Sequence, residues 1–276
     1  MGGGNQRIAT LVAYDLQSGT YVEGVRQNPE FNKTWCKQLA DLIDPVLPDN
    51  GSILEVGVGE ATTLSGVLSE LGDKVKRSYG FDISWSRIKV ANDYLIEKSQ
   101  KSELFVGDIF HIPLADNSID VVYSSHSLEP NGGHEEQLIA ECFRVARKSV
   151  VLIEPIYELA SKEAQARMRQ HGYVRGLRDV AIKLDCTIQD YRLLKYVSNP
   201  LNPSGVLIIN KLDFGSSNNR QSNSTKELPW QCPLTGSILV KKDEYFYSED
   251  AGIAYPIFQG VPLLRAEHAI ISSLLR

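Results

Sequence analysis

The sequence predicts an α/β protein with a doubly wound, mostly parallel sheet that ends in an antiparallel hairpin, followed by a small β-rich C-terminal module. Three observations support this prediction. Short apolar runs alternate with helix-period segments over residues 50–155. Two later apolar runs are joined by a loop too short for a helical crossover. A polar stretch without apolar residues, 215–225, then precedes a short tail.

Composition narrows the class of protein. The 276 residues suit one large domain with a small one beside it, and 42% hydrophobic residues provide a packed core. No apolar run approaches the ~18 residues that cross a bilayer, and no secretory signal is evident. We therefore expect a cytoplasmic protein that does not associate with membranes. The net charge of −5 disfavours nucleic acid as a partner without ruling it out. The four cysteines are widely spaced and form no CxxC pair, so we expect no disulfide framework.

The first strand is expected at residues 52–56, where a short apolar run ends at Gly57. The next apolar residues recur at i, i+3, i+4 and i+7, which is one face of a helix: Leu64, Val67, Leu68 and Leu71. Gly72 follows as a C-terminal cap. Residues 79–82 close a second strand. Ser84 can cap the helix after it, whose apolar positions are Ile88, Ala91 and Leu95.

Three further strands are expected at residues 104–106, 119–123 and 150–153. The helix before the last of these is marked by its apolar residues, Leu138, Ile139, Cys142, Phe143 and Ala146. This alternation indicates a parallel sheet with helices on both faces. Residues 192–197 and 206–209 flank a turn-rich loop, so we expect these two strands to pair antiparallel.

The strongest motif is the glycine turn after the first strand. Gly57 and Gly59 let a ligand approach the backbone, and Asp82, 23 residues after Gly59, can accept hydrogen bonds from ribose hydroxyls. A dinucleotide is the lesser interpretation, because Thr62 stands where that fingerprint has its last glycine. Glu55 would also repel a pyrophosphate but suits a cationic ligand.

These residues resemble the class I S-adenosylmethionine-dependent methyltransferases, of the small-molecule, methyltransferase type 11-like kind, whose first motif is E/D-x-G-x-G-x-G. Ala61 replaces the third glycine. The resemblance implies a Rossmann-like fold with S-adenosyl-L-methionine as cofactor, its amino-acid end held by Glu55 and the glycine turn. It also implies contacts to the ribose and adenine from Asp82 with Ile83 and from Asp108 with Ile109, and one from Ser125 at the fourth strand. Residues 141–145 resemble the E-x-x-R-V helix of the same family.

Methyl transfer is an in-line displacement at a sulfonium methyl, so positioning supplies much of the acceleration, and an oxygen acceptor also needs a base. The candidate catalytic residues follow the fourth and fifth strands: His126, Glu129, His134, Glu154 and Tyr157. Tyr14 and Tyr21 in the N-terminal segment are candidates for a lid over the cofactor, and a core-packing role is equally open.

The tail resembles the small zinc-ribbon-like activator subunit of RNA and protein methyltransferases, through CPxTGxxL at 232–239 and a segment similar to YPIxxGIPxL at 255–264. Cys232 is the only cysteine of the tail, so we expect no metal there and a buried sulfur. The tail's apolar residues are too many for it to bury alone: Ile253, Ile257, Val261, Leu263, Leu264, Ile270, Ile271 and Leu274. They call for a partner, either the methyltransferase domain or a second subunit in a homodimer.

The sequence thus predicts an N-terminal helical lid (1–49), a methyltransferase domain (50–212), a linker (213–227) and the C-terminal module (228–276). The expected function is methyl transfer to a small molecule, such as a sugar or metabolite hydroxyl. Two alternatives remain open: an RNA or protein methyltransferase that docks through the module, and a non-catalytic scaffold that has kept the cofactor fold.

Overall fold

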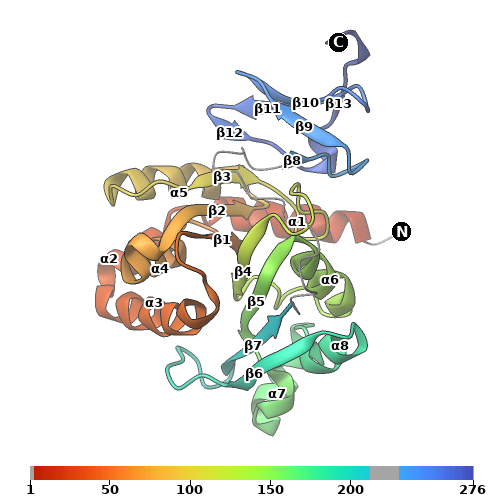
Figure 1. Cartoon of the computed structure of the whole chain (residues 1–276). Helices are drawn as coiled ribbons and strands as arrows, with labels where there is room; N and C mark the ends of the chain where they lie inside the picture. Colours follow the sequence, from red (N-terminus) through yellow and green to blue (C-terminus); the bar gives the residue numbers. More distant parts are fainter. Residues whose placement is uncertain (1–2, 212–229, 276) are drawn as a thin grey trace.

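A computed structural model of the chain describes residues 3–211 and 230–275, arranged around two sheets (Figure 1). The predicted linker lies outside the described residues. The larger sheet has the strand order β3-β2-β1-β4-β5-β7-β6. Its strands are β1 (Gly51–Val56), β2 (Val75–Asp82), β3 (Glu103–Val106), β4 (Ile119–Ser125), β5 (Ala146–Pro155), β6 (Thr187–Leu193) and β7 (Ser204–Asn210). Strands β1 to β5 run parallel, and β7 pairs antiparallel with both of its neighbours, β5 and β6, which confirms the predicted fold class.

Helices cover both faces of this sheet. Alternate strand residues explain the two layers: Ile53 and Val121 pack in a cluster with α3, α4 and α5, whereas Leu54 and Val122 pack in a cluster with α6 and α8. The helices are α1 (Gly3–Leu16), α2 (Thr20–Gln27), α3 (Pro29–Ile43), α4 (Thr62–Leu71), α5 (Trp85–Glu97), α6 (Glu135–Val145), α7 (Lys162–Gln170) and α8 (Leu177–Lys183). The predicted caps of α4 and α5, Gly72 and Ser84, are in place.

The hairpin forms, but its first strand lies earlier than predicted. Strand β6 ends at Leu193, so the expected strand 192–197 was wrong for most of its length. The reason is that the chain leaves the sheet there: the backbone N–H of Tyr196 donates to the side chain of Gln38 on α3. Strand β7 inserts between β5 and β6. Ala146, expected in a helix, instead begins β5.

The C-terminal module is a second, antiparallel sheet. Its strands are β8 (Trp230–Gln231), β9 (Ile238–Lys241), β10 (Tyr245–Ser248), β11 (Ile253–Phe258), β12 (Val261–Pro262) and β13 (Ile270–Ile271). The module sits on the β3 edge of the large sheet (Figure 1). The N–H of Leu264 donates to the carbonyl of Val106 at 2.9 Å. The ring of Trp230 stacks edge-on against Phe105, with centroids 5.1 Å apart. The two sheets therefore share one continuous core.

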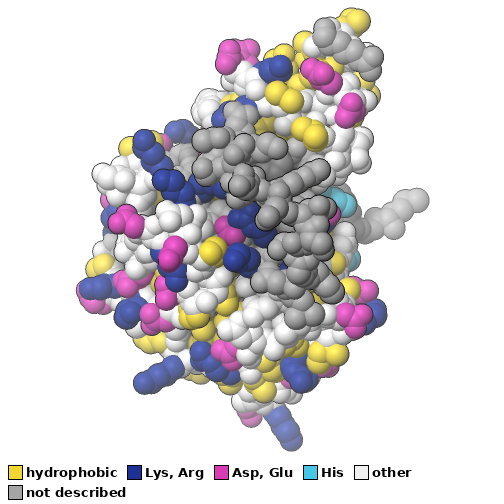
Figure 2. Space-filling model, viewed as in Figure 1, with side chains coloured by type: hydrophobic (Ala, Val, Ile, Leu, Met, Phe, Trp, Pro, Cys, Tyr) yellow, Lys and Arg dark blue, Asp and Glu magenta, His cyan; other side chains and the backbone are white. Residues whose placement is uncertain are grey.

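The surface carries both signs of charge in mixture, and apolar side chains stand exposed on the module (Figure 2). Within residues 3–211 and 230–275, no helix combines the length and the apolar character that crossing a bilayer requires.

Candidate cofactor and active site

The site lies where the strand order reverses. Strand β1 is flanked by β2 on one side and β4 on the other. In open α/β sheets, ligands bind at the carboxyl edge beside such a reversal of strand order. Glu55, Asp82 and Ser125 all stand at this edge, as the sequence predicts.

The glycine turn after β1 adopts a backbone that favours glycine. Gly57 and Gly59 have φ of 66° and 55°. A Cβ on Gly57 would lie 2.3 Å from the Cβ of Ser127, so the loop after β4 packs directly on this turn. Ala61 stands where the motif has glycine, yet it also adopts a positive φ of 58° as it caps α4. That departure from the motif costs about 1 kcal/mol of backbone strain.

Asp82 connects the turn to the next helix. Its carboxylate accepts hydrogen bonds from the N–H of Gly59 at 3.1 Å and of Ser84 at 2.9 Å. Burial raises the pKa of Asp82, and these amides together with Arg87 oppose that rise by favouring the charged form.

Glu55 lies beneath the turn and is almost fully buried. The Tyr123 hydroxyl donates to it at 2.9 Å. Burial raises the pKa of Glu55 to about 8, although the Tyr123 hydrogen bond acts in the opposite direction. A cationic ligand group nearby would lower this pKa and stabilise the charged carboxylate.

Arg87 is a site residue that the sequence reasoning missed. Arg87 is buried, and its guanidinium lies over the rings of Tyr14 and Tyr21, 4.9 and 4.8 Å from their centroids. The Nε donates to the carbonyl of Tyr14, whereas Nη2 is buried with no hydrogen-bond partner. The helical spacing could have indicated that Arg87 is buried, because it shares a face of α5 with the buried residues Ala91 and Tyr94.

The N-terminal segment is tied to the turn by a second missed residue. Glu60 accepts hydrogen bonds from the N–H groups of Gly19 and Val22, both at 2.8 Å, at the start of α2. On α1, Asp15 accepts from the Ser84 hydroxyl at 2.7 Å. These contacts hold Tyr14 and Tyr21 over Arg87, next to Gly59.

Asp108 and Ile109 follow β3 at the same edge. Asp108 is buried and accepts a hydrogen bond from the N–H of Phe110 at 3.1 Å. Ile109 packs against the main core and is partly exposed. Ile83 lines a groove beside them.

His126 follows β4 and is held at both ring nitrogens. Glu129 accepts from Nδ1 at 2.8 Å, and the Ser204 hydroxyl lies 2.7 Å from Nε2. Asn202 donates to the same Glu129 oxygen at 3.2 Å. Burial lowers the pKa of His126, but the hydrogen bond and charge of Glu129 outweigh it, so the pKa is raised above the ordinary 6.5.

The other three candidate catalytic residues are placed differently. Glu154 is fully buried and accepts hydrogen bonds from the backbone N–H groups of residues 127–129, so it fixes the loop that carries His126. Burial raises the pKa of Glu154 to about 7. His134 precedes α6 and packs edge-on against Phe110. The Tyr157 hydroxyl accepts a hydrogen bond from Arg169.

No metal is suggested by the described part of the chain, where no three His, Cys, Asp or Glu side chains cluster as ligands. Cys232 is buried, with its sulfur 3.3 Å from the Tyr255 hydroxyl.

Comparison with known proteins gives one family match. Residues 54–153 match a family model described as a methyltransferase domain. That segment begins in β1 and ends in β5, so it contains the glycine turn, Asp82, Asp108 and His126. No curated protein sequence matches the chain.

Solved structures share the fold at low identity. Magnesium protoporphyrin IX methyltransferase from Synechocystis PCC 6803, solved with bound SAH, has a TM-score of 0.53 at 13% identity over 73% of this chain and 99% of that one. A chain from the complex between the Haloferax volcanii Trm112 methyltransferase activator and a methyltransferase has a TM-score of 0.54 at 12% identity, covering 71% and 96%. Geranyl diphosphate C-methyltransferase from Streptomyces coelicolor has a TM-score of 0.50 at 10% identity, over 63% of this chain and 78% of that one.

The match of residues 54–153 to a methyltransferase domain and the shared fold support methyl transfer as the activity and S-adenosylmethionine as the cofactor. The residues fit that cofactor. Buried Glu55 and Asp82 suit its ammonium and ribose hydroxyls, and the unpaired Nη2 of Arg87 suits its carboxylate.

Proposed function

We propose that this protein transfers a methyl group from S-adenosylmethionine to a hydroxyl of a small molecule, such as a sugar or another metabolite. The observation that carries the proposal is the Glu129–His126 pair at the end of β4, the strand next to the glycine turn. A hydroxyl acceptor needs a base to take its proton, and His126, oriented by Glu129, is proposed as that base.

The proposed cofactor residues divide by strand. Glu55, Gly57 and Gly59 hold the amino-acid end, and Asp82 holds the ribose. When bound, the cofactor supplies an electrophilic methyl group on sulfur. The remaining proposed contacts come from Tyr21 in the lid and from the residues after the next two strands, Ile83, Asp108, Ile109 and Ser125.

The tautomer of His126 follows from its contacts. Glu129 is a carboxylate acceptor, so Nδ1 carries the proton and Nε2 presents its lone pair. The Ser204 hydroxyl at Nε2 supports the view that this nitrogen accepts a hydroxyl proton. In the proposed reaction, Nε2 would take the proton of the acceptor hydroxyl as its oxygen bonds to the methyl carbon. The bond from that carbon to sulfur would break, S-adenosylhomocysteine would leave, and Glu129 would stabilise the imidazolium that forms.

Calorimetric titration tests the cofactor assignment. S-adenosylhomocysteine should bind the wild-type protein more tightly than NAD does. Asp82→Ala should weaken that binding by about 1–3 kcal/mol, because ribose hydroxyls lose their charged acceptor. Tighter binding of NAD, or equal affinity in the variant, would contradict the assignment.

A macromolecular acceptor is the second candidate, because one fold relative was solved with a methyltransferase activator. In that case the C-terminal module would serve for docking, and RNA or protein would carry the transferred methyl group. A third candidate, a non-catalytic scaffold, would bind the cofactor and transfer nothing.

A further inference from the structure

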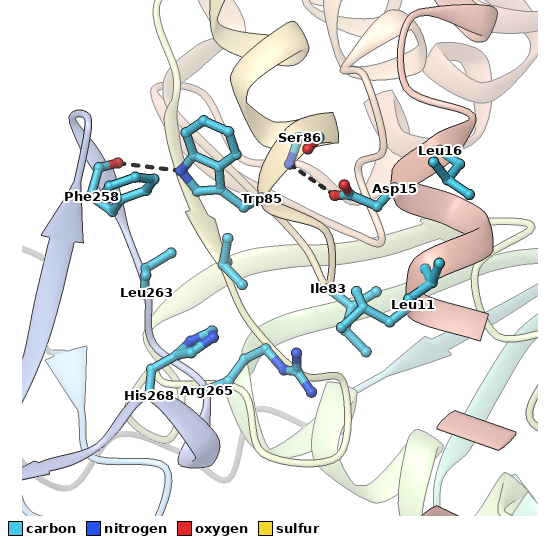
Figure 3. Close-up of a pocket in the computed structure, with 12 residues that line it drawn as sticks. Leu11, Asp15, Leu16, Ile83, Trp85, Ser86, Phe258, Leu263, Arg265 and His268 are labelled. Atoms are coloured by element: carbon cyan, nitrogen blue, oxygen red, sulfur yellow. Dashed lines mark hydrogen bonds between the residues drawn. The ribbon is translucent and has the colours of Figure 1, made fainter. Parts of the chain in front are cut away.

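A groove of about 480 Å³ lies between α1, the start of α5 and the C-terminal module (Figure 3). This volume is within the range of small-molecule sites. Its walls are apolar, with Leu11 from the lid helix, Ile83 after β2 and Leu263 from the module. Such walls suit the two faces of a flat ring.

The module also brings two polar side chains into this groove, Arg265 and His268. The Arg265 side chain is only 9% exposed and reaches from the module toward Ile83 (Figure 3). Its Nη2 donates to Glu267, but its Nε is buried with no hydrogen-bond partner. The Nδ1 of His268 is likewise buried and unpartnered. Because unpaired buried polar atoms are costly, these two atoms point to a ligand.

The two free atoms have complementary roles. Arg265 Nε carries a hydrogen and can only donate. Burial lowers the pKa of His268, which keeps the ring neutral, and a backbone hydrogen bond of the ring to Leu263 leaves Nδ1 as the lone-pair nitrogen. A ligand edge with an acceptor beside a donor matches this pair. Adenine has such an edge, a ring nitrogen beside its amino group.

The strand order places the groove on the nucleoside side of the cofactor site. The glycine turn follows β1, Asp82 is the last residue of β2, and the groove continues from Ile83 toward β3. A ligand with its amino-acid end at the turn and its ribose at Asp82 must direct its base this way. His126 follows β4, on the other side of β1.

We propose that the C-terminal module completes the cofactor site, with Arg265 and His268 binding the edge of the adenine ring; this inference rests on the proposed function. Two contacts fix the position of these side chains relative to the large sheet. One is the backbone pairing of Leu264 with Val106 at 2.9 Å, next to Arg265. The other is the Trp85 indole, which donates to the carbonyl of Phe258 at 3.3 Å.

Calorimetry with S-adenosylhomocysteine and S-inosylhomocysteine tests the proposal on the full chain. The inosyl base has an oxygen in place of the amino group. Arg265→Met should bind S-adenosylhomocysteine about tenfold more weakly than wild type. Wild type should prefer the adenosyl ligand about tenfold, and His268→Phe should lose that preference. Arg178→Met, a surface control on α8, should match wild type.

Photolabelling of the wild-type protein is a second test of the proposal, and it needs no variant. An 8-azidoadenosyl analogue of the cofactor should label the peptide containing residues 263–268. Labelling confined to residues 1–211, or unchanged affinity in a folded Arg265→Met protein, would overturn the proposal while leaving the methyltransferase assignment intact. Failure of wild type to bind S-adenosylhomocysteine at all would instead overturn the proposed function, and this inference with it.

Discussion

His126 is held in an unusual backbone conformation for a non-glycine residue, with a φ of 58°. The carboxylate of Glu154 holds this backbone conformation by accepting hydrogen bonds from the N–H groups of the next three residues. Glu129 orients the imidazole ring through its hydrogen bond with Nδ1. Such strain is kept where surrounding contacts determine the geometry, as at active sites.

Replacing His126 with alanine should therefore reduce the methyl-transfer rate by about 10²–10⁴-fold, the usual contribution of a general base. Affinity for S-adenosylhomocysteine should stay the same, because His126 is proposed to contact the acceptor. Single-turnover kinetics and calorimetry measure the two quantities. His171→Ala, at an exposed position after α7, is the matched control. A full rate in the His126 variant would remove the base from the mechanism.

The rate should also depend on pH in a defined direction. His126 acts as a base only when neutral, and Glu129 raises its pKa above 6.5. The rate should thus increase as pH rises, with a midpoint above 6.5. Glu129→Gln removes the charge and should move that midpoint down. A pH–rate profile of both proteins checks this, and an unmoved midpoint would show that another group titrates.

The positions of the cofactor turn, Asp82 and His126 could be predicted from the sequence, because each lies at the end of a strand with a clear apolar pattern or directly after one. Arg87 and Glu60 could not be assigned in the same way. Their partners, Tyr14 and the N–H groups of Gly19 and Val22, lie far away in the sequence and come into contact only in the folded chain.

Among the elements, the β3 edge explains why the tail is attached to this domain. An uncovered edge strand pairs readily with other chains. Here Leu263 and Leu264 cover it, and Trp230 extends the core across the junction to Phe105 and Phe246. The apolar tail residues thus find part of their partner in the chain's own methyltransferase domain.

Trp230→Ala should lower the free energy of unfolding by about 3–5 kcal/mol, the cost of removing a buried aromatic side chain. Both sheets should be affected together, since they share one core. Chemical denaturation followed by circular dichroism measures this. Leu234→Ala, exposed in the same module, should change stability by less than about 0.5 kcal/mol. A tryptophan variant as stable as wild type would mean that the module is an independent appendage.

The hairpin of β6 and β7 shows where the apolar pattern of the sequence is not enough to place a strand. Strand β6 lies at the edge of the sheet, is largely polar and has no buried residue, so its sequence carries little strand signal. The strand was therefore predicted at 192–197, where apolar residues are more frequent. Strand β7, buried along nearly its whole length, was placed correctly. Which of the two lies next to β5 depends on tertiary packing and is not encoded in the local pattern.

At the scale of the whole molecule, helix α1 and the C-terminal module, from opposite ends of the described chain, line one groove beside Ile83. The module's outer side still exposes apolar residues: Ile271 is 88% and Leu274 is 98% exposed. A homodimer through this side stays a prediction. Light scattering should give twice the chain mass for wild type and the chain mass for the double variant Ile271→Asp, Leu274→Asp. A monomeric wild type would contradict it.

The central claim is methyl transfer to a small molecule with His126 as base. Its most direct test is to incubate the protein with cell extract and methyl-labelled S-adenosylmethionine, and to follow the label by mass spectrometry. We predict that wild type places the label on a low-mass metabolite with a free hydroxyl and that His126→Ala does not. Label found only in RNA or protein, or on no acceptor at all, would contradict the claim.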